Sequence, residues 1–195
     1  MRLILIAFLI AGLGNCNKVQ ADNTVYIDQV GDNNTYNVSQ SGDGQSVNIS
    51  VGKIASSDGN TVSVTQRDAT AKTANISISS GINNSVSVTQ EGTGNHVTNI
   101  QNLTGSANTI TVGQSGAGNH TFGVTNNPGT TNNNNTITAT QSGGVGADKW
   151  FNVWLNGSSG ANVSVTQTNP TTPSAASMSI NCAPGTCGTW SYSAQ

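Results

Sequence analysis

The chain has 195 residues, of which only 7% are charged and 5% aromatic, and its formal net charge is −2. Asn, Ser and Thr together supply 75 residues, Gly supplies 23, and there are two His. A globular enzyme normally carries about 25% charged residues and positioned general bases. This composition therefore argues against an enzyme, and the lack of a basic excess argues against binding to nucleic acid.

The first 21 residues have the pattern of a secretory signal peptide. Arg2 gives a positive start, and residues 3–13 form an apolar run that is too short for a transmembrane helix of about 20 residues. Residues 19–21, Val-Gln-Ala, fit a small-x-small cleavage site. We therefore predict a secreted chain that starts at Asp22 and has no integral membrane segment. The alternative is a lipid anchor on Cys16.

The rest of the chain repeats one unit, Asn-x-Val/Ile-x-Val-x-Gln, usually followed by Gly two residues later. Successive side chains of a strand point to opposite faces, so the four marked positions of a unit share one face. The clearest units begin at residues 34, 60, 84, 108, 135 and 161, and weaker ones at 23, 45, 74, 95, 120, 149 and 176. Because clear and weaker units alternate, the pattern predicts rungs of two strands and two turns.

These thirteen predicted strands indicate an all-β fold, a β-solenoid of about six and a half strand-turn-strand rungs that form two stacked parallel sheets. The repeats cover residues 22–168. Residues 169–195 are expected to add a C-terminal strand and a Cys-containing tail, which is either a cap on the stack or a docking point for an anchor. Gly in the linkers and the exclusion of Pro from the units agree with this arrangement. The alternative is a disordered chain that tends to aggregate as β-structure.

The amides at the two ends of each unit define the expected interior. Val and Ile would fill a thin core between the sheets, where Asn or Gln is costly unless it is hydrogen-bonded. In register, each amide can bond the identical amide one rung above and below, as in cross-β assemblies. We therefore expect inward ladders of Asn and Gln; the alternative is that these residues lie in solvated loops.

Residues 90–101 read Gln-Glu-Gly-Thr-Gly-Asn with a further Gln six residues on. This motif resembles the curlin repeat of curli-type bacterial functional amyloids, and the resemblance extends over about residues 23–167. It implies a secreted, fimbrial subunit of stacked rungs that polymerises end to end into adhesive fibres of the biofilm matrix. The partners it implies are further copies of the chain, a nucleator, and outer-membrane export or chaperone proteins. Whether the chain is the major subunit or the nucleator stays open.

The resemblance also implies which residues form the ladders that polymerisation would extend. They are Asn23, Gln29, Asn34, Gln40, Asn60, Gln66, Asn84, Gln90, Asn95, Gln101, Asn108, Gln114, Asn135, Gln141 and Gln167. Gly and Asp in the turns temper aggregation in the family, and the matching residues are Gly31, Asp32, Gly42, Asp43 and Asp58. The chain departs from the family in its longer, less even rungs, in repeats that start at Asn23 without a preceding leader, and in its Cys-containing tail.

Other chemistry-bearing residues are few. Cys182 and Cys187 are candidates for a disulfide, as a secreted chain favours, or are two free thiols. The two His, at 96 and 120, are expected in solvent or ladder positions. We expect no catalytic residues, no cofactor and no metal site. Trp150 and Trp154 would face outward, as a carbohydrate or partner platform or as packing against a loop or filament, and Trp190 and Tyr192 would cover the last rung.

Two further functions fit the same fold. Rows of outward Thr and Ser, such as Thr61-Ser63-Thr65, resemble the ice-binding face of some antifreeze solenoids, although they equally suit a strand that faces water. A repeat fibre of a viral appendage is the other alternative.

Overall fold

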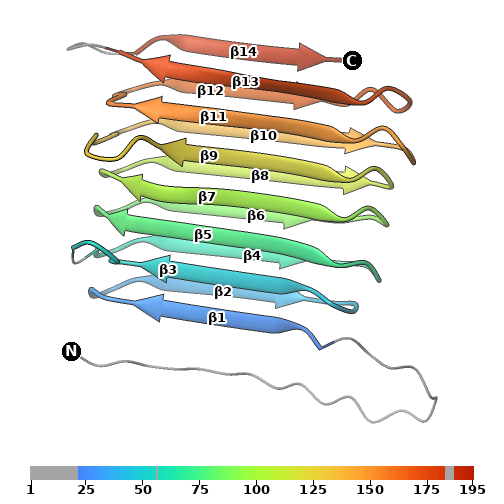
Figure 1. Ribbon diagram of the computed structural model, residues 1–195. Coiled ribbons are helices and arrows are strands. Elements are labelled where there is room, and N and C mark those ends of the chain that lie inside the picture. Colours follow the sequence, from blue (N-terminus) through green and yellow to red (C-terminus); the bar gives the residue numbers. More distant parts are fainter. Residues whose placement is uncertain (1–21, 56, 183–186) are drawn as a thin grey trace.

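The computed structural model describes residues 22–55, 57–182 and 187–195 (Figure 1). The predicted signal segment, with Cys16, lies outside the described residues. Throughout the described ranges the chain forms strands and turns without any helix, so no helix is present there that could cross a membrane. The strands are β1 (Thr24–Gln29), β2 (Thr35–Gln40), β3 (Ser46–Val51), β4 (Thr61–Gln66), β5 (Lys72–Ser80), β6 (Ser85–Gln90), β7 (His96–Thr104), β8 (Thr109–Gly116), β9 (His120–Asn126), β10 (Thr136–Gly143), β11 (Lys149–Asn156), β12 (Asn162–Gln167), β13 (Ser174–Asn181) and β14 (Thr189–Ala194).

The strands form two seven-stranded sheets. One, the odd sheet, has the order β1-β3-β5-β7-β9-β11-β13, and the other, the even sheet, has the order β14-β12-β10-β8-β6-β4-β2. Strands that pair within a sheet are parallel. Figure 1 shows the two sheets as facing layers, and successive strands of the chain alternate between them. The predicted β-solenoid of two parallel sheets is therefore confirmed.

The last rung differs from the prediction of six and a half rungs. Strand β13 pairs with β11, and a fourteenth strand, β14, pairs with β12, which completes a seventh rung. The C-terminal segment therefore continues both sheets, and Trp190 and Tyr192 lie on β14, packed against the core. The sequence Thr-Trp-Ser-Tyr-Ser-Ala of β14 lacks the Asn and Gln that mark the other even strands, which explains why it was missed.

The core lies between the sheets and follows from the two-residue alternation. In β6, Val86, Val88 and Gln90 are buried, whereas Ser85 and its alternate neighbours face outward. Each of these Val stacks in register on the equivalent residue of the next even strand. Burial of a side chain of this size contributes about 1.5–3 kcal/mol, so the stack is held by many similar contributions spread along one continuous core.

The turns need Gly where successive rungs touch. Gly81 has φ +129°, and a Cβ atom there would lie 1.8 Å from the Gly105 carbonyl oxygen. Gly105 has φ +102°, and a Cβ atom there would lie 2.0 Å from the Asn132 oxygen. A side chain is therefore excluded at both turns by backbone geometry and by the rung above.

In one strand the predicted inner face was wrong. Asn95 and Gln101 were expected to face inward, but both are exposed. The buried residues of β7 include His96, Thr98 and Ile100, which pair with Lys72, Ala74 and Ile76 of β5. Because the side-chain period of a strand is two, a shift of one residue exchanges its faces, and the paired Ile residues fix the register in favour of the apolar set.

Candidate functional site

A continuous ladder of Gln side chains runs along the inside of the even sheet. Each amide nitrogen donates to the amide oxygen of the Gln in the next even strand, over 2.7–2.9 Å. The members are Gln40, Gln66, Gln90, Gln114, Gln141 and Gln167. The spacing between members varies from 24 to 27 residues while the hydrogen bonds keep their length, so the turns absorb the differences in repeat length.

A second ladder, of Asn side chains, precedes the even strands and runs in the opposite sense. Each amide nitrogen donates to the Asn oxygen of the preceding rung over 2.9–3.0 Å, and the backbone N–H of the same residue donates to that oxygen too. The members are Asn34, Asn60, Asn84, Asn108 and Asn135. Buried amides are thus satisfied from rung to rung, as burial requires.

Four of the predicted ladder residues lie outside these ladders. Asn23 donates to the Gly42 carbonyl at 2.9 Å, and Gln29 donates to the Gly31 carbonyl at 2.7 Å. The other two, Asn95 and Gln101, are exposed, as described above. All four belong to the odd sheet, so the structure brings together the predicted residues of the even sheet only.

The equivalent register position of the odd sheet holds a column of basic residues, which was not predicted from the sequence. Lys72, His96, His120 and Lys149 occupy successive register positions and are buried. Lys72 Nζ donates to the Gly92 carbonyl at 2.8 Å, and Lys149 Nζ donates to the Thr172 carbonyl. Burial lowers the pKa of both lysines. The sequence signal was weak, because His120 and Lys149 begin two of the weaker units whereas Lys72 and His96 lie outside the marked positions.

The two His of this column are held at one nitrogen each. Nε2 of His96 lies 2.7 Å from the Glu91 carbonyl oxygen, and Nε2 of His120 lies 2.9 Å from that of Ser115. Nδ1 of both rings is buried without a partner among the described residues. Burial lowers the pKa of His96 from 6.5 to about 4, and it also lowers the pKa of His120. Both rings are therefore neutral at pH 7.

A comparison with protein families gives one match, within the central rungs of the stack. A family model described as curlin associated repeat matches residues 81–116. The chain carries a curlin repeat. The match spans β6, β7 and β8, and it therefore includes Gln90 and Gln114 of the Gln ladder. No curated protein and no solved structure matched the chain in the other two comparisons.

The solenoid leaves its core half-covered at both ends. At the start of the chain, Val25, Ile27 and Val38 point toward the core but are only partly buried. At the other end the same is true of Met178, Trp190 and Tyr192. Equivalent positions of the interior rungs are fully buried. Among the described strands, β1, β2, β13 and β14 each pair with one neighbour, so each presents an outer edge that another strand could join.

Two further predicted sites lie near the C-terminal end of the curlin-repeat stack. Cys182 and Cys187 form a disulfide with Cα atoms 5.6 Å apart. Trp150 and Trp154 lie on the outer face of β11 and are 44% and 42% exposed. Within the described ranges, no group of three or more His, Cys, Asp or Glu is placed to hold a metal ion.

Proposed function

We propose that the chain is a secreted, extracellular fibre subunit of the curli type, which polymerises end to end for adhesion and for the biofilm matrix. The observation that carries this proposal is the pair of half-covered ends on a solenoid whose sheets are parallel and in register. Docking β1 and β2 of one copy on β13 and β14 of another would continue both sheets. The same contact would bury the partly exposed apolar residues of both ends, with the favourable free energy of apolar burial.

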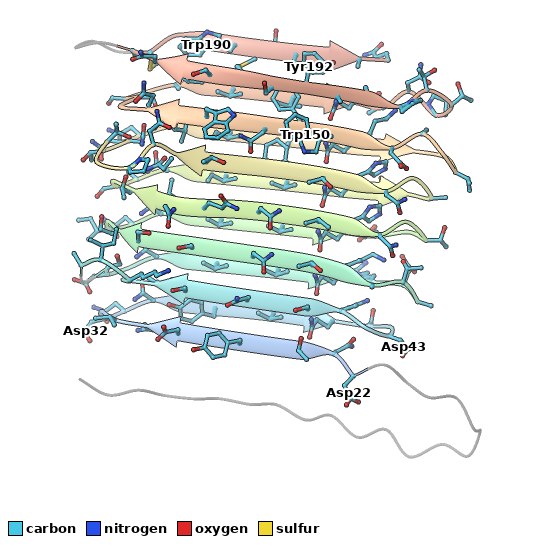
Figure 2. The ribbon with its side chains drawn as sticks, viewed as in Figure 1. Asp22, Asp32, Asp43, Trp150, Trp190 and Tyr192 are labelled. Carbon is cyan, nitrogen blue, oxygen red and sulfur yellow. A yellow bond between two sulfur atoms is a disulfide. The ribbon has the colours of Figure 1, made fainter. Side chains whose placement is uncertain are left out.

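The charge distribution supports growth in one polarity. The first rung carries Asp22, Asp28, Asp32 and Asp43 and no basic residue, whereas residues 150–195 contain no charged side chain. Figure 2 labels three of these Asp at the first rung. Two first rungs brought together would repel each other, whereas a first rung docked on the last rung of another copy meets no charged side chain. The charge distribution therefore favours a head-to-tail fibre.

The curlin repeat supports the wider role of this subunit. Other copies would be its main partners, with a nucleator and outer-membrane export proteins acting before and during growth. The proposal includes removal of residues 1–21, which would expose the first rung at the start of the mature chain. The role is structural and involves no catalysis.

The test is a matched pair of single substitutions on β2. V38K places a charge on the half-buried inner side of the first rung, and S39K places the same charge on the outer face of the same strand. Wild type and S39K should bind an amyloid dye, form filaments in electron micrographs and give a cross-β reflection at about 4.7 Å. V38K should stay monomeric. A wild-type chain that stays monomeric for days, or V38K filaments that match those of wild type, would contradict the proposal.

A second candidate function is ice binding, which the outer face of the even sheet favours. Its outward residues, such as Thr136, Thr138 and Thr140 and their register partners Thr109 and Thr111, are small and hydroxylated. They form a regular grid on a flat sheet. Thermal hysteresis from the soluble monomer would support this function, and its absence in wild type and V38K would exclude it.

A further inference from the structure

The outer face of β11 carries two exposed indole rings, those of Trp150 and Trp154, on an otherwise small and polar surface. Figure 2 shows Trp150 on this strand. Trp150 and Trp154 are separated by four residues, which corresponds to about 13 Å along a strand. The neighbouring strands present Thr121 and Ala175 beside Trp150, and Thr125 and Ser179 beside Trp154. Since these neighbours are small, the indoles stand clear of the surface.

Asn152, between the two indoles, holds one of them in place. In the amide orientation that satisfies both of its ends, its oxygen accepts a hydrogen bond from Trp154 Nε1 at 2.8 Å, and its nitrogen donates to the Gly123 carbonyl at 3.3 Å. Gly123 makes room for this contact, because a Cβ atom there would lie 2.1 Å from the Asn152 amide. The polar edge of Trp154 is thus occupied within the protein, and the ring face remains for a ligand.

A depression of about 510 Å³ adjoins Trp150. Its lining residues include Thr121, Asp148, Pro173, Ser174 and Ala175. One carboxylate oxygen of Asp148 accepts a hydrogen bond from the Asn119 N–H at 2.8 Å, which leaves the other oxygen for a ligand. The depression therefore places hydroxyl groups and one carboxylate acceptor next to an aromatic face. Sites that orient small polar ligands typically combine apolar walls with a few polar groups in this way.

From these features we propose that Trp150 and Trp154 form a binding platform for a neutral polysaccharide with flat pyranose rings, of the β-1,4-glucan class. Such a polymer offers C–H faces that stack on indoles and hydroxyl edges that bond Thr, Ser and Asp. The outward residues of β9, β11 and β13 carry no charge, which matches a neutral ligand. A second protein chain fits less well, because a stable interface buries about 1,200–2,000 Å² and only two large apolar side chains stand out on these three strands.

The platform deepens the proposed function, because a head-to-tail fibre would repeat it once per subunit. At about 4.8 Å per rung, the seven rungs place successive platforms about 34 Å apart. One long polysaccharide could then contact many subunits, which raises its overall affinity above that of a single site.

The experiment measures binding of the full chain to hydroxyethyl cellulose by affinity electrophoresis and to cellohexaose by Trp fluorescence. W150A and W154A should each bind at least tenfold more weakly than wild type. N152A, which keeps both indoles but frees Trp154, should weaken binding severalfold. The matched control is Y26A, which removes an aromatic that is 49% exposed on the same outer face, at β1, and it should bind as wild type does.

Three results would overturn the platform. They are no saturable binding of either glucan by wild type, equal binding by W150A and W154A in chains with an unchanged urea midpoint, and stronger retardation by the charged polymer alginate. Loss of filament bundling in these variants, without a change in glucan binding, would instead assign the rings to contacts between fibres. V38K separates the two proposals: if V38K binds cellohexaose while wild type forms no fibres, the platform stands and the proposed fibre function fails.

Discussion

The imidazole of His96 lies parallel to that of His120, with ring centroids 4.9 Å apart and planes 9° apart. Lys72 precedes this pair in the column and Lys149 follows it. Two acidic side chains favour the charged forms of this column: Asp68 acts on Lys72, and Asp148 acts on His120 and Lys149. Glu91 contributes its carbonyl oxygen to His96. A proton on either ring would therefore be placed in a dry environment next to another basic group.

This stack predicts that acid destabilises the fold. The pKa of His96 is about 4 in the folded state against an ordinary 6.5, so between these values the unfolded chain binds a proton that the folded chain does not. The free energy of unfolding therefore has its full value above about pH 6.5. It falls as the pH drops toward 4, by about 3 kcal/mol for His96. Urea unfolding of the V38K monomer at pH 7.5 and 4.5 measures this loss. The double substitution H96Q/H120Q should flatten the pH dependence; an unchanged profile would exclude the stack as its source.

The Gln ladder predicts a large cost for a single deletion. Q90A removes the hydrogen bonds to Gln66 and Gln114. Gln66 then keeps only the Ser46 carbonyl as acceptor, and the Gln114 oxygen keeps only the Thr98 hydroxyl as donor. Each lost bond costs about 0.5–1.5 kcal/mol net and the cavity left by the side chain adds to this, so the free energy of unfolding should fall by about 2–4 kcal/mol. Q101A deletes an exposed Gln of the odd sheet and should stay within about 0.5 kcal/mol of wild type. Equal urea midpoints for the two variants would contradict the ladder.

The tight turns predict a contrast between two glycines. G81A forces a side chain against the Gly105 carbonyl at positive φ, and we expect a loss of roughly 2–4 kcal/mol. Gly113 faces outward on β8, and a Cβ atom there would meet only the Ala139 oxygen, at 3.9 Å. Thermal unfolding of G113A should therefore match or slightly exceed wild type. A G81A chain as stable as G113A would show that the turns relax.

The disulfide predicts a local effect of reduction. Cys182 lies after β13, and Cys187 precedes β14, where its N–H donates to the Ser159 carbonyl at 2.7 Å. A short disulfide-closed loop contributes about 2 kcal/mol. After reduction, the amides of β14 should exchange hydrogen faster, while those of β6 keep their protection. Uniform loss of protection in both strands would instead indicate global unfolding.

The contact between successive copies in the proposed fibre, which we call the seam, predicts a substitution that stabilises the fibre. Ala194 occupies the register position after Gln167, so a copy docked there would place Gln40 against a methyl group and break the Gln ladder. A194Q restores an amide at the seam, and its fibres should dissolve at a higher guanidinium concentration than those of wild type. S193Q, one residue away on the outer face, is the control. Equal resistance of both variants would argue against this seam.

The sequence predicted the even sheet more accurately than the odd one, for a physical reason. In the even sheet, amides at both ends of a strand need identical partners in the next rung. Asn84 and Gln90 therefore fix which residues of the strand between them face inward. In the odd sheet, residues at the strand ends do not need identical partners, so Gln45, Lys72 or His96 can occupy the same register position. Near Asn95, packing against β5 decides which residues face inward. That packing depends on the paired strand, which a single unit does not reveal.

Because the turns absorb three extra residues between Gln114 and Gln141 without stretching the amide bond, the rim of the stack is tolerant of insertion. Val145, 89% exposed between β10 and β11, marks a point where a foreign peptide could be grafted. On an assembled fibre, each subunit would carry one graft. The grafts would form a row along the fibre, with a spacing set by the length of the subunit. The protein is therefore a starting point for ordered, self-supporting display materials.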